Sequence, residues 1–155
     1  MEFRLVGPHD VEALADVFGD IDATFFRPHP FTRAEARAIA DRTGPDAYVL
    51  LFDDGRPVAY GMLRGWNEGY ATPSLGIATR TDSQRRGFGR LLMQHLHDLA
   101  RRQGAKNVRL RVHPDNTKAR RLYESLAYEY AGRDRGELVM ILDVSLSDPD
   151  GDPAP

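Results

Sequence analysis

The sequence predicts an α/β protein with a mixed, mostly antiparallel central sheet that is flanked by helices. One observation is the run at 107–112, where apolar and basic residues alternate as in a half-buried strand. Another is the run at 88–99, where apolar residues recur at the spacing of an amphipathic helix. The third is the order of the elements along the chain, which is β-α-α-β-β-β-α-β-α-β-β and places several strands in direct succession.

The N-terminal part is expected to hold one strand and two helices around an irregular segment. A short strand at 3–6 precedes a helix that Pro8 opens. Residues 20–31 contain two prolines, three phenylalanines and a histidine, which indicates an ordered loop with an aromatic surface. Thr32 and Glu35 then form a capping box, so the second helix begins there.

The middle of the chain predicts three strands and a long helix. The runs at 48–52 and 57–63 are strand-like, and Asp-Asp-Gly-Arg between them is a hairpin signal. After a loop at 65–73, the run at 75–79 is the third of these strands. The helix that follows is expected to begin near Arg86. Its inward side chains are expected to be Phe88, Leu91, Leu92, His95, Leu96 and Leu99.

The C-terminal part predicts one more helix and a strand pair. Residues 113–116 interrupt the strand pattern, and the acidic or amide side chain there can cap the next helix. Two strands are expected at about 128–133 and 137–144. We expect one domain over 1–146 and a disordered tail over 147–155, because the last residues are rich in Pro, Asp and Gly.

Bulk composition limits the classes of function. A chain of 155 residues with 41% hydrophobic and 28% charged residues fits one globular domain. The net charge of −2 gives no reason to expect a nucleic-acid partner. Cysteine is absent, which excludes disulfides and thiolate metal sites. Neither a signal peptide nor a membrane span is visible, so we expect a cytoplasmic protein. We expect no bound metal, because His95 and His97 lie two residues apart on a predicted helix and do not share a face.

A basic segment with two glycines, at 84–89, indicates a phosphate site. It follows the strand at 75–79 and opens a helix, whose unpaired N–H groups carry partial positive charge. Gly87 and Gly89 have no Cβ, so phosphates can approach the backbone closely. Three arginines add charge nearby, namely Arg85, Arg86 and Arg90.

Three phosphate motifs compete for this segment. The P-loop pattern is absent, and the dinucleotide pattern fails because Leu92 stands where its last glycine belongs. What remains is Q-x-x-G-x-G, which by itself is also compatible with a tight turn into a helix.

A second segment supports the phosphate interpretation. After the strand at 107–112, Asn116, Ala119 and Tyr123 follow in an N-x-x-A-x-x-x-Y pattern on a predicted helix. Both segments, in this order and spacing, resemble the two signatures of the GNAT acetyltransferase superfamily, over roughly residues 3–144. The chain departs from the usual Gly-Phe ending, since Ala127-Tyr128 stands there, and alanine is a poor residue for that turn.

The resemblance implies the GNAT fold and acetyl-CoA as co-substrate. It implies that the loop holds the pyrophosphate, that strand backbone groups line the pantetheine arm, and that one N–H faces the thioester oxygen. The residues implied in cofactor binding are Ile77, Ala78, Thr79, Gln84, Arg85, Arg86, Gly87, Phe88, Gly89, Arg90, Asn116 and Tyr123. It also implies that Tyr123 is the general acid beside the sulfur, the alternative being an ordinary core aromatic.

The acceptor side is less determined. A lysine-like amine has a pKa of about 10, so a base or a water relay must remove its proton. We expect Glu68 to be that base, although it also fits an exposed turn residue, and His29 and His113 are the rivals. The GNAT resemblance implies that the acceptor lies between the loop at 25–31 and the loop at 65–73. Phe25, Phe26 and His29 would then form one wall, and Trp66 and Tyr70 would belong to the other. The phenylalanines fit a core role equally well.

These expectations favour an N-acetyltransferase that acts on a small-molecule amine. A protein acceptor, through a lysine or an N-terminus, is the alternative among enzymes. A non-catalytic acyl-CoA sensor is the alternative from another class. Since GNAT proteins often dimerise, a homodimer is a possible assembly.

Overall fold

Residues 1–26 and 28–145 are described by the computed structural model, which contains a seven-stranded sheet in the order β1-β2-β3-β4-β5-β7-β6. The tail expected at 147–155 lies outside these residues. The strands are β1 (Glu2–Leu5), β2 (Ala47–Asp53), β3 (Arg56–Arg64), β4 (Ser74–Thr79), β5 (Asn107–Val112), β6 (Glu129–Asp134) and β7 (Glu137–Asp143). The helices are α1 (Val11–Phe18), α2 (Arg33–Ala40), α3 (Phe88–Arg102) and α4 (Thr117–Ser125), with short 3₁₀ helices η1 (Pro8–Asp10), η2 (Trp66–Glu68) and η3 (Thr81–Ser83).

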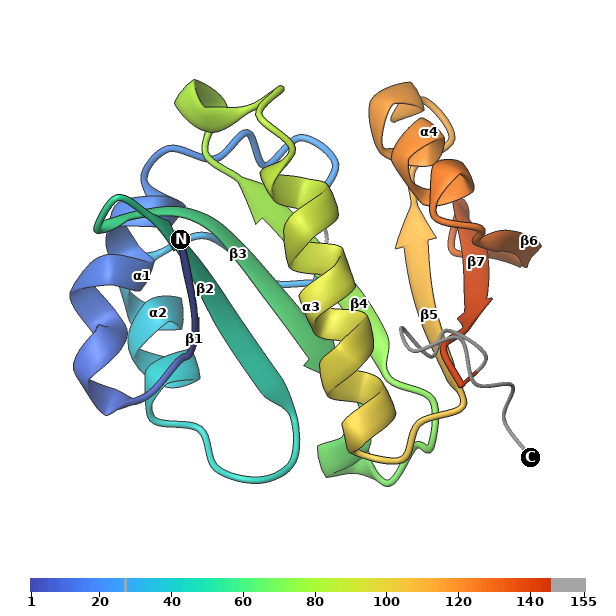
Figure 1. The fold of residues 1–155 in the computed structure, drawn as a ribbon, viewed down its shortest axis with the longest axis horizontal. Helices are drawn as coiled ribbons and strands as arrows, with labels where there is room; N and C mark the ends of the chain where they lie inside the picture. Colours follow the sequence, from blue (N-terminus) through green and yellow to red (C-terminus); the bar gives the residue numbers. More distant parts are fainter. Residues whose placement is uncertain (27, 146–155) are drawn as a thin grey trace.

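The strand pairing confirms the predicted mixed, mostly antiparallel sheet. Strands β1 to β4 pair antiparallel in sequence order, and β5, β7 and β6 form a second antiparallel group. The only parallel pairing, among the described strands, joins β4 to β5. Figure 1 shows that these two strands separate at one end, with α3 in front of β3 and β4 and with α4 beside β5.

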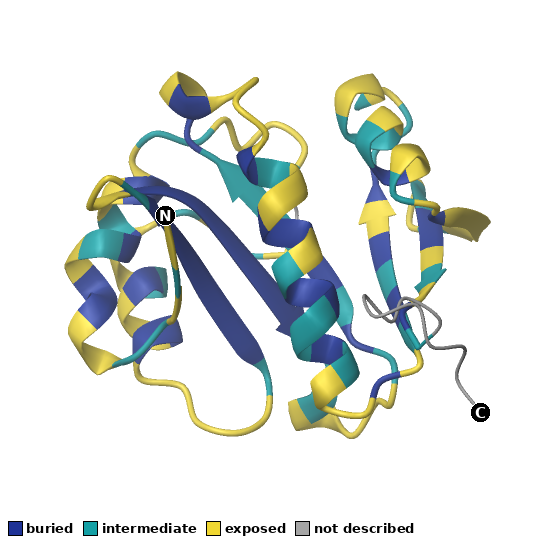
Figure 2. Ribbon diagram, viewed as in Figure 1, coloured by how far each residue is buried: buried dark blue, intermediate teal, exposed yellow. Residues whose placement is uncertain are grey.

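Helices cover both faces of the sheet at β2 and β3. Helices α1 and α2 pack on one face of these strands, and α3 packs on the opposite face of the sheet. All residues of β2 except the last are buried, and Figure 2 shows β2 and β3 as the darkest, most buried strands. A continuous apolar run is the pattern expected when both faces are covered.

Helix α3 lies close to β3 because of one glycine. A Cβ at Gly61 would come 2.8 Å from a methyl carbon of Leu96, so a larger residue would push the helix away. Two of the residues expected inward on α3 are misplaced by the sequence pattern. Leu91 is exposed, and His95 is only half-buried, where it stacks on Phe3 at 4.2 Å between ring centroids.

A buried histidine fills part of the inward face of α3 instead. The Nε2 atom of His97 lies 2.6 Å from the hydroxyl oxygen of Tyr128. Tyr128 directly precedes β6, at the start of the β6–β7 hairpin. Burial lowers the pKa of His97 to about 4, so this imidazole is neutral at neutral pH. The pair joins α3 to the C-terminal half of the sheet.

Candidate active site

The site is a cleft that opens where β4 and β5 separate. Pairing between these strands is confined, in the described chain, to Ser74 and Arg109. Beyond that point a cleft of about 1370 Å³ lies between them, bordered by the loop before α2 and by the β6–β7 hairpin. On its other edge β4 remains fully paired with β3. Residues 75–79 therefore present an edge without a strand partner to the cleft, and backbone N–H and C=O groups there can bind a ligand.

The segment at 84–89 forms the N-terminus of α3, beside the cleft. Gly87 is the N-cap residue, with φ of +81°, and no side chain caps the helix. A Cβ at Gly87 would meet no atom within 4 Å, so the space in front of this turn is open. A Cβ at Gly89 would point instead toward Ile77 and Leu122, at 3.7 and 3.6 Å. The arrangement gives the helix end free donors and room for an anion.

Several predicted phosphate-binding side chains are engaged elsewhere. Phe88 is buried in the core, so only its backbone is available to a ligand. Arg86 forms an ion pair with Asp53 at 3.1 Å, and Arg90 donates to the Ser125 hydroxyl at 2.6 Å. These contacts position the loop, and none of the residues 85–90 lines the cleft.

Two polar residues from different segments of the chain form a hydrogen bond at the mouth of the cleft. Lys118, in the first turn of α4, donates to the Gln84 side-chain oxygen at 3.0 Å, and both residues line the cleft. Asn116 also lines it, and its side chain accepts from the Ala119 N–H at 3.3 Å, as the N-cap of α4. Asn116 was expected at the cofactor, whereas Lys118, whose ammonium group contacts Gln84, lies at a position that no sequence motif marks.

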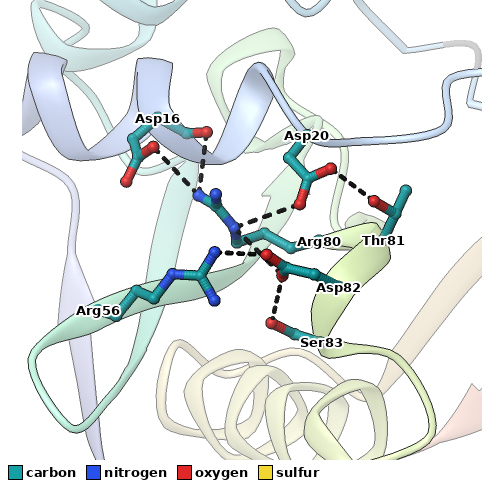
Figure 3. A network of polar contacts seen from close by, with 7 residues as sticks. All are labelled: Asp16, Asp20, Arg56, Arg80, Thr81, Asp82 and Ser83. Carbon is teal, nitrogen blue, oxygen red and sulfur yellow. Dashed lines mark hydrogen bonds and ion pairs between the residues drawn. The ribbon is translucent and has the colours of Figure 1, made fainter.

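A buried arginine anchors the start of the loop. The side chain of Arg80, the residue after β4, is 9% exposed, and its Nη1 donates to the Asp16 carbonyl at 3.0 Å. The carboxylates of Asp16, Asp20 and Asp82 lie 3.3 to 3.6 Å from its nitrogens, as Figure 3 shows. The Nε atom is buried, and it forms the ion pairs with Asp20 and Asp82 without a hydrogen bond. The network ties α1 to the segment that leads into the phosphate loop.

We expect Arg80→Met to lower the free energy of unfolding by about 1.5–3 kcal/mol, because a hydrogen bond from a buried charged group is lost. Arg56→Met is the matched control, since Arg56 contacts only Asp82 of the same network and is exposed. Denaturant unfolding of the two variants measures the difference. Equal, small losses in both would show that Arg80 does not anchor the loop.

Tyr123 lies at the bottom of the cleft. Its side chain is nearly buried, 8% exposed, and it lines the cleft. Its hydroxyl makes no hydrogen bond with any described residue, and its ring packs on that of Tyr128 at 5.9 Å. Burial raises the pKa of Tyr123 to about 12, so the phenol keeps its proton at neutral pH. A protonated hydroxyl without a partner is available to donate into the cleft.

Some of the residues expected on the acceptor side line the cleft, namely Phe25, Phe26, Glu68 and Tyr70. Ile77, Ala78 and Thr79, which were expected at the cofactor, line it as well. Trp66 does not, since it packs on the hydrophobic core under α3. His29 does not either, because it lies among the aromatic rings between α1 and β3. Sequence periodicity cannot separate the acceptor-side residues that line the cleft from those that do not, since none of them lies in a strand or an α-helix.

The two histidine candidates for the base have their nitrogens engaged. His29 Nδ1 lies 2.8 Å from the Pro30 carbonyl oxygen. A carbonyl oxygen can only accept a hydrogen bond, so Nδ1 carries the ring proton. Nε2 then accepts from the Tyr60 hydroxyl at 2.9 Å. Burial also lowers the pKa of His29. His113 lines the cleft, but its Nδ1 accepts from the Asp115 N–H at 3.1 Å. In the neutral ring Nε2 then carries the proton, and neither ring has a free lone pair for an amine.

The fold and the cleft define a class of protein, and comparison with known proteins identifies the family. Residues 14–128 match the family described as "Acetyltransferase (GNAT) family". The chain belongs to this family. The predicted family and fold are thereby confirmed, and the enzyme class, an acyltransferase, is confirmed at the level of the family.

Named relatives share a part of the sequence. The [Ribosomal protein bS18]-alanine N-acetyltransferase of Salmonella typhimurium is 44% identical over 55 residues, which are 36% of this chain and 37% of that enzyme. The same enzyme of Escherichia coli K12 is 42% identical over 55 residues, with the same coverage of 36% and 37%. The alignment thus spans little more than a third of the length of these relatives.

Solved structures share the whole fold. The PaiA N-acetyltransferase from Thermoplasma acidophilum in complex with coenzyme A superposes with a TM-score of 0.77 at 14% identity, over 92% of this chain and 98% of that one. The ribosomal-protein-S18-alanine N-acetyltransferase of Escherichia coli superposes with a TM-score of 0.73 at 22% identity, over 95% and 96%. At these identities the likeness shows the fold alone. None of the helices in the described part of the chain is long and apolar enough to cross a membrane.

Proposed function

We propose that the protein transfers the acetyl group of acetyl-CoA to the primary amine of a small molecule. The observation that carries the proposal is the unpaired edge of β4, which opens on a cleft lined by the free hydroxyl of Tyr123. The pantetheine arm of acetyl-CoA contains amide groups, which can form hydrogen bonds with that edge as a neighbouring strand would. Bound there, acetyl-CoA supplies an activated acyl group and a thiolate leaving group.

The residues present fit such a donor. Gly87 and the uncapped end of α3 offer backbone N–H groups to a pyrophosphate, and Lys118 adds a cation across the cleft mouth. Along the unpaired edge, β4 presents the N–H groups of Ile77 and Thr79, since those of the alternate residues point to β3. A preorganised donor of this kind contributes about 3 kcal/mol to stabilising an oxyanion. Tyr123 lies below them with its proton retained, in a position to protonate the departing sulfur.

Glu68 remains the best candidate for the base. It lines the cleft at the end of η2, and its carboxylate makes no hydrogen bond or ion pair with a described residue. Both histidine rivals lack a free lone pair, as their hydrogen bonds show. A carboxylate at this position attracts the cationic amine and accepts its proton, directly or through one water.

The loop before α2 favours a compact acceptor. The Phe25 ring, in the loop before α2, contacts the His113 ring, which follows β5, at 4.9 Å between centroids, and both residues line the cleft. A contact between two residues that line the cleft leaves less room for an extended peptide. The second candidate acceptor is the N-terminal amine of a protein, which the activity named for the bS18-alanine relatives favours.

We expect Glu68→Gln to lower kcat/KM for the amine about five- to tenfold, because the shape is kept while the charge and the base are lost. Glu137→Gln is the matched control, since Glu137 is a second carboxylate that lines the cleft from the β6–β7 hairpin. The measurement is a pH–rate profile of all three proteins with one good substrate, and CoA affinity should not change. If the profiles of Glu68→Gln and the native protein coincide, Glu68 is not the base.

The function itself is tested by thiol release across a panel of amines and peptides. Turnover with free amines of low molecular mass, well above that with peptides, is the expected result. Faster turnover with peptide N-termini would support the protein acceptor instead. CoA binding without turnover on any amine would support the acyl-CoA sensor.

A further inference from the structure

The acceptor side of the cleft contains a row of polar residues across three strands. Arg64 of β3 pairs in register with Ser74 of β4, and Ser74 pairs with Arg109 of β5. Residues that are directly opposite on neighbouring strands project from the same face of a sheet. All three of these residues line the cleft. We call Arg64, Ser74 and Arg109 the arginine row.

The arginine row faces away from α3. Alternate residues of β5, namely Val108, Leu110 and Val112, are buried in the core under α3. Because successive side chains of a strand point to opposite faces, Arg109 projects from the other face. Helices α1 and α2 cover that face over β2 and β3. The arginine row lies beside the covered part, because it begins at the last residue of β3 and continues over β4 and β5. It is therefore open to the cleft, where an acceptor would enter.

The charge of the row is not neutralised within the described chain. Arg109 forms no ion pair or side-chain hydrogen bond with any described residue, and Arg64 donates only to the Pro28 carbonyl, at 3.3 Å. By contrast, Arg111, which is the next residue on the same face of β5, is paired with Asp134 at 2.7 Å. Two like charges on one face of a sheet repel each other, and an anion between them is attracted by both. The backbones of Arg64 and Arg109 are two strands apart, roughly 10 Å, so two long side chains can meet over Ser74.

The row is too far from the phosphate loop to serve the donor. Ser74 begins β4 and Thr79 ends it, so five residues of extended chain, roughly 17 Å, separate the row from the end of the strand that leads to Gln84. The pyrophosphate site and the arginine row therefore lie at opposite ends of β4. An anion bound at the row belongs to the other substrate.

We propose that the acceptor is an aminocarboxylate, whose carboxylate binds to the arginine row while its amine lies near Glu68. This inference rests on the proposed function, since it assigns the acceptor class of the same cleft. Arginine presents paired N–H donors that match a carboxylate, and the Ser74 hydroxyl adds a further donor between them. Glu68 precedes β4 on the same loop and supplies the opposite charge for the ammonium group. The cleft thus carries one partner for each end of the acceptor.

The test compares 6-aminohexanoate with 6-aminohexanamide, which has the same amine and length but no charge at the far end. We expect the native enzyme to show a kcat/KM at least tenfold higher for the carboxylate. Arg64→Gln and Arg109→Gln should each remove most of that preference by lowering kcat/KM for the carboxylate and sparing the amide. Arg111→Gln is the matched control, and it should keep the preference because its guanidinium is already paired.

Equal rates on the two probes, or an undiminished preference in both row variants, would overturn the inference and leave acetyl transfer to amines standing. So would row-dependent acetylation of an acidic peptide by an enzyme that does not acetylate the aminocarboxylate. Calorimetric titration of both probes into the CoA-saturated protein tests the inference even without turnover. Binding of the carboxylate alone, lost in Arg109→Gln, supports the row, whereas equal binding of both probes, or of neither, overturns it. Absence of transfer to every amine would count against the proposed function alone.

Discussion

Gly87→Val should weaken CoA binding about ten- to a hundredfold while the protein remains folded. Gly87 has φ of +81° at the N-cap of α3, a conformation that a β-branched residue adopts only with strain of about 1–3 kcal/mol. The space around the missing Cβ is open, so the cost is conformational and not steric. The loop is expected to relax this strain by leaving the conformation that presents its N–H groups to the pyrophosphate. Titration calorimetry with CoA measures the loss.

Gly104→Val is the matched control. Gly104 has φ of +89° with no atom within 4 Å of its missing Cβ, and it follows the opposite end of the same helix. Both variants should therefore lose similar free energy of unfolding. Only Gly87→Val should lose CoA affinity. Equal affinity in the two variants would mean that this turn does not bind the phosphates.

The fold was predictable where periodicity and turn chemistry agree. The hairpin at 53–56, the helix start at Thr32 and the alternating β5 each have a local cause, and each is found in the structure. Of the expected capping box, the bond from the Glu35 N–H to the Thr32 hydroxyl forms, while the Glu35 carboxylate pairs with Arg42. The separation of β4 from β5 has no local signal, because pairing depends on strands that are distant in sequence. Only the family resemblance indicated it. The buried His97 was missed, since its partner Tyr128 lies 31 residues away.

The alanine at position 127, where the family pattern has glycine, affects only the local turn. Ala127 takes φ of +72°, in the left-handed region where the usual glycine carries no penalty. The Tyr128 N–H donates to the Tyr123 carbonyl at 3.0 Å, and the Ala127 N–H donates to the Glu124 carbonyl at 3.0 Å. This is the Schellman arrangement. The turn therefore forms with alanine, at the cost of backbone strain, and Tyr123 keeps its place at the end of α4.

The motifs predicted several residues that line the cleft, but the sequence did not predict which arginines are paired and which are free. Gln84, Asn116 and Tyr123 line the cleft as their motif positions suggested. Of the arginines expected at the phosphates, Arg86 and Arg90 bind Asp53 and Ser125 instead, whereas Arg64 and Arg109, which were not expected in the site, line the cleft. Which side of a strand an arginine occupies follows from alternation. Whether its charge is free follows only from the packing of distant residues.

Tyr123→Phe should lower kcat about 10- to 100-fold with little change in KM for acetyl-CoA. The ring, which packs on Tyr128, is kept, and only a hydroxyl without a hydrogen-bond partner in the described chain is removed. The effect belongs at the low end for general acids, because a thiol with a pKa of about 8.5 leaves with little help. Tyr128→Phe is the matched control. It breaks the hydrogen bond to His97, so it should cost stability and leave kcat nearly unchanged.

The dependence of this effect on pH separates proton donation from packing. Because burial raises the pKa of Tyr123 to about 12, the phenol is protonated throughout the range from about pH 6 to 9 in which the enzyme can be assayed. The ratio of the native kcat to that of Tyr123→Phe should therefore be large and constant over this range. A solvent isotope effect on the chemical step that is smaller in the variant would support donation by the hydroxyl. A variant with native kcat at every pH would place Tyr123 in the core as a packing residue, and the thiolate would then leave by taking its proton from water.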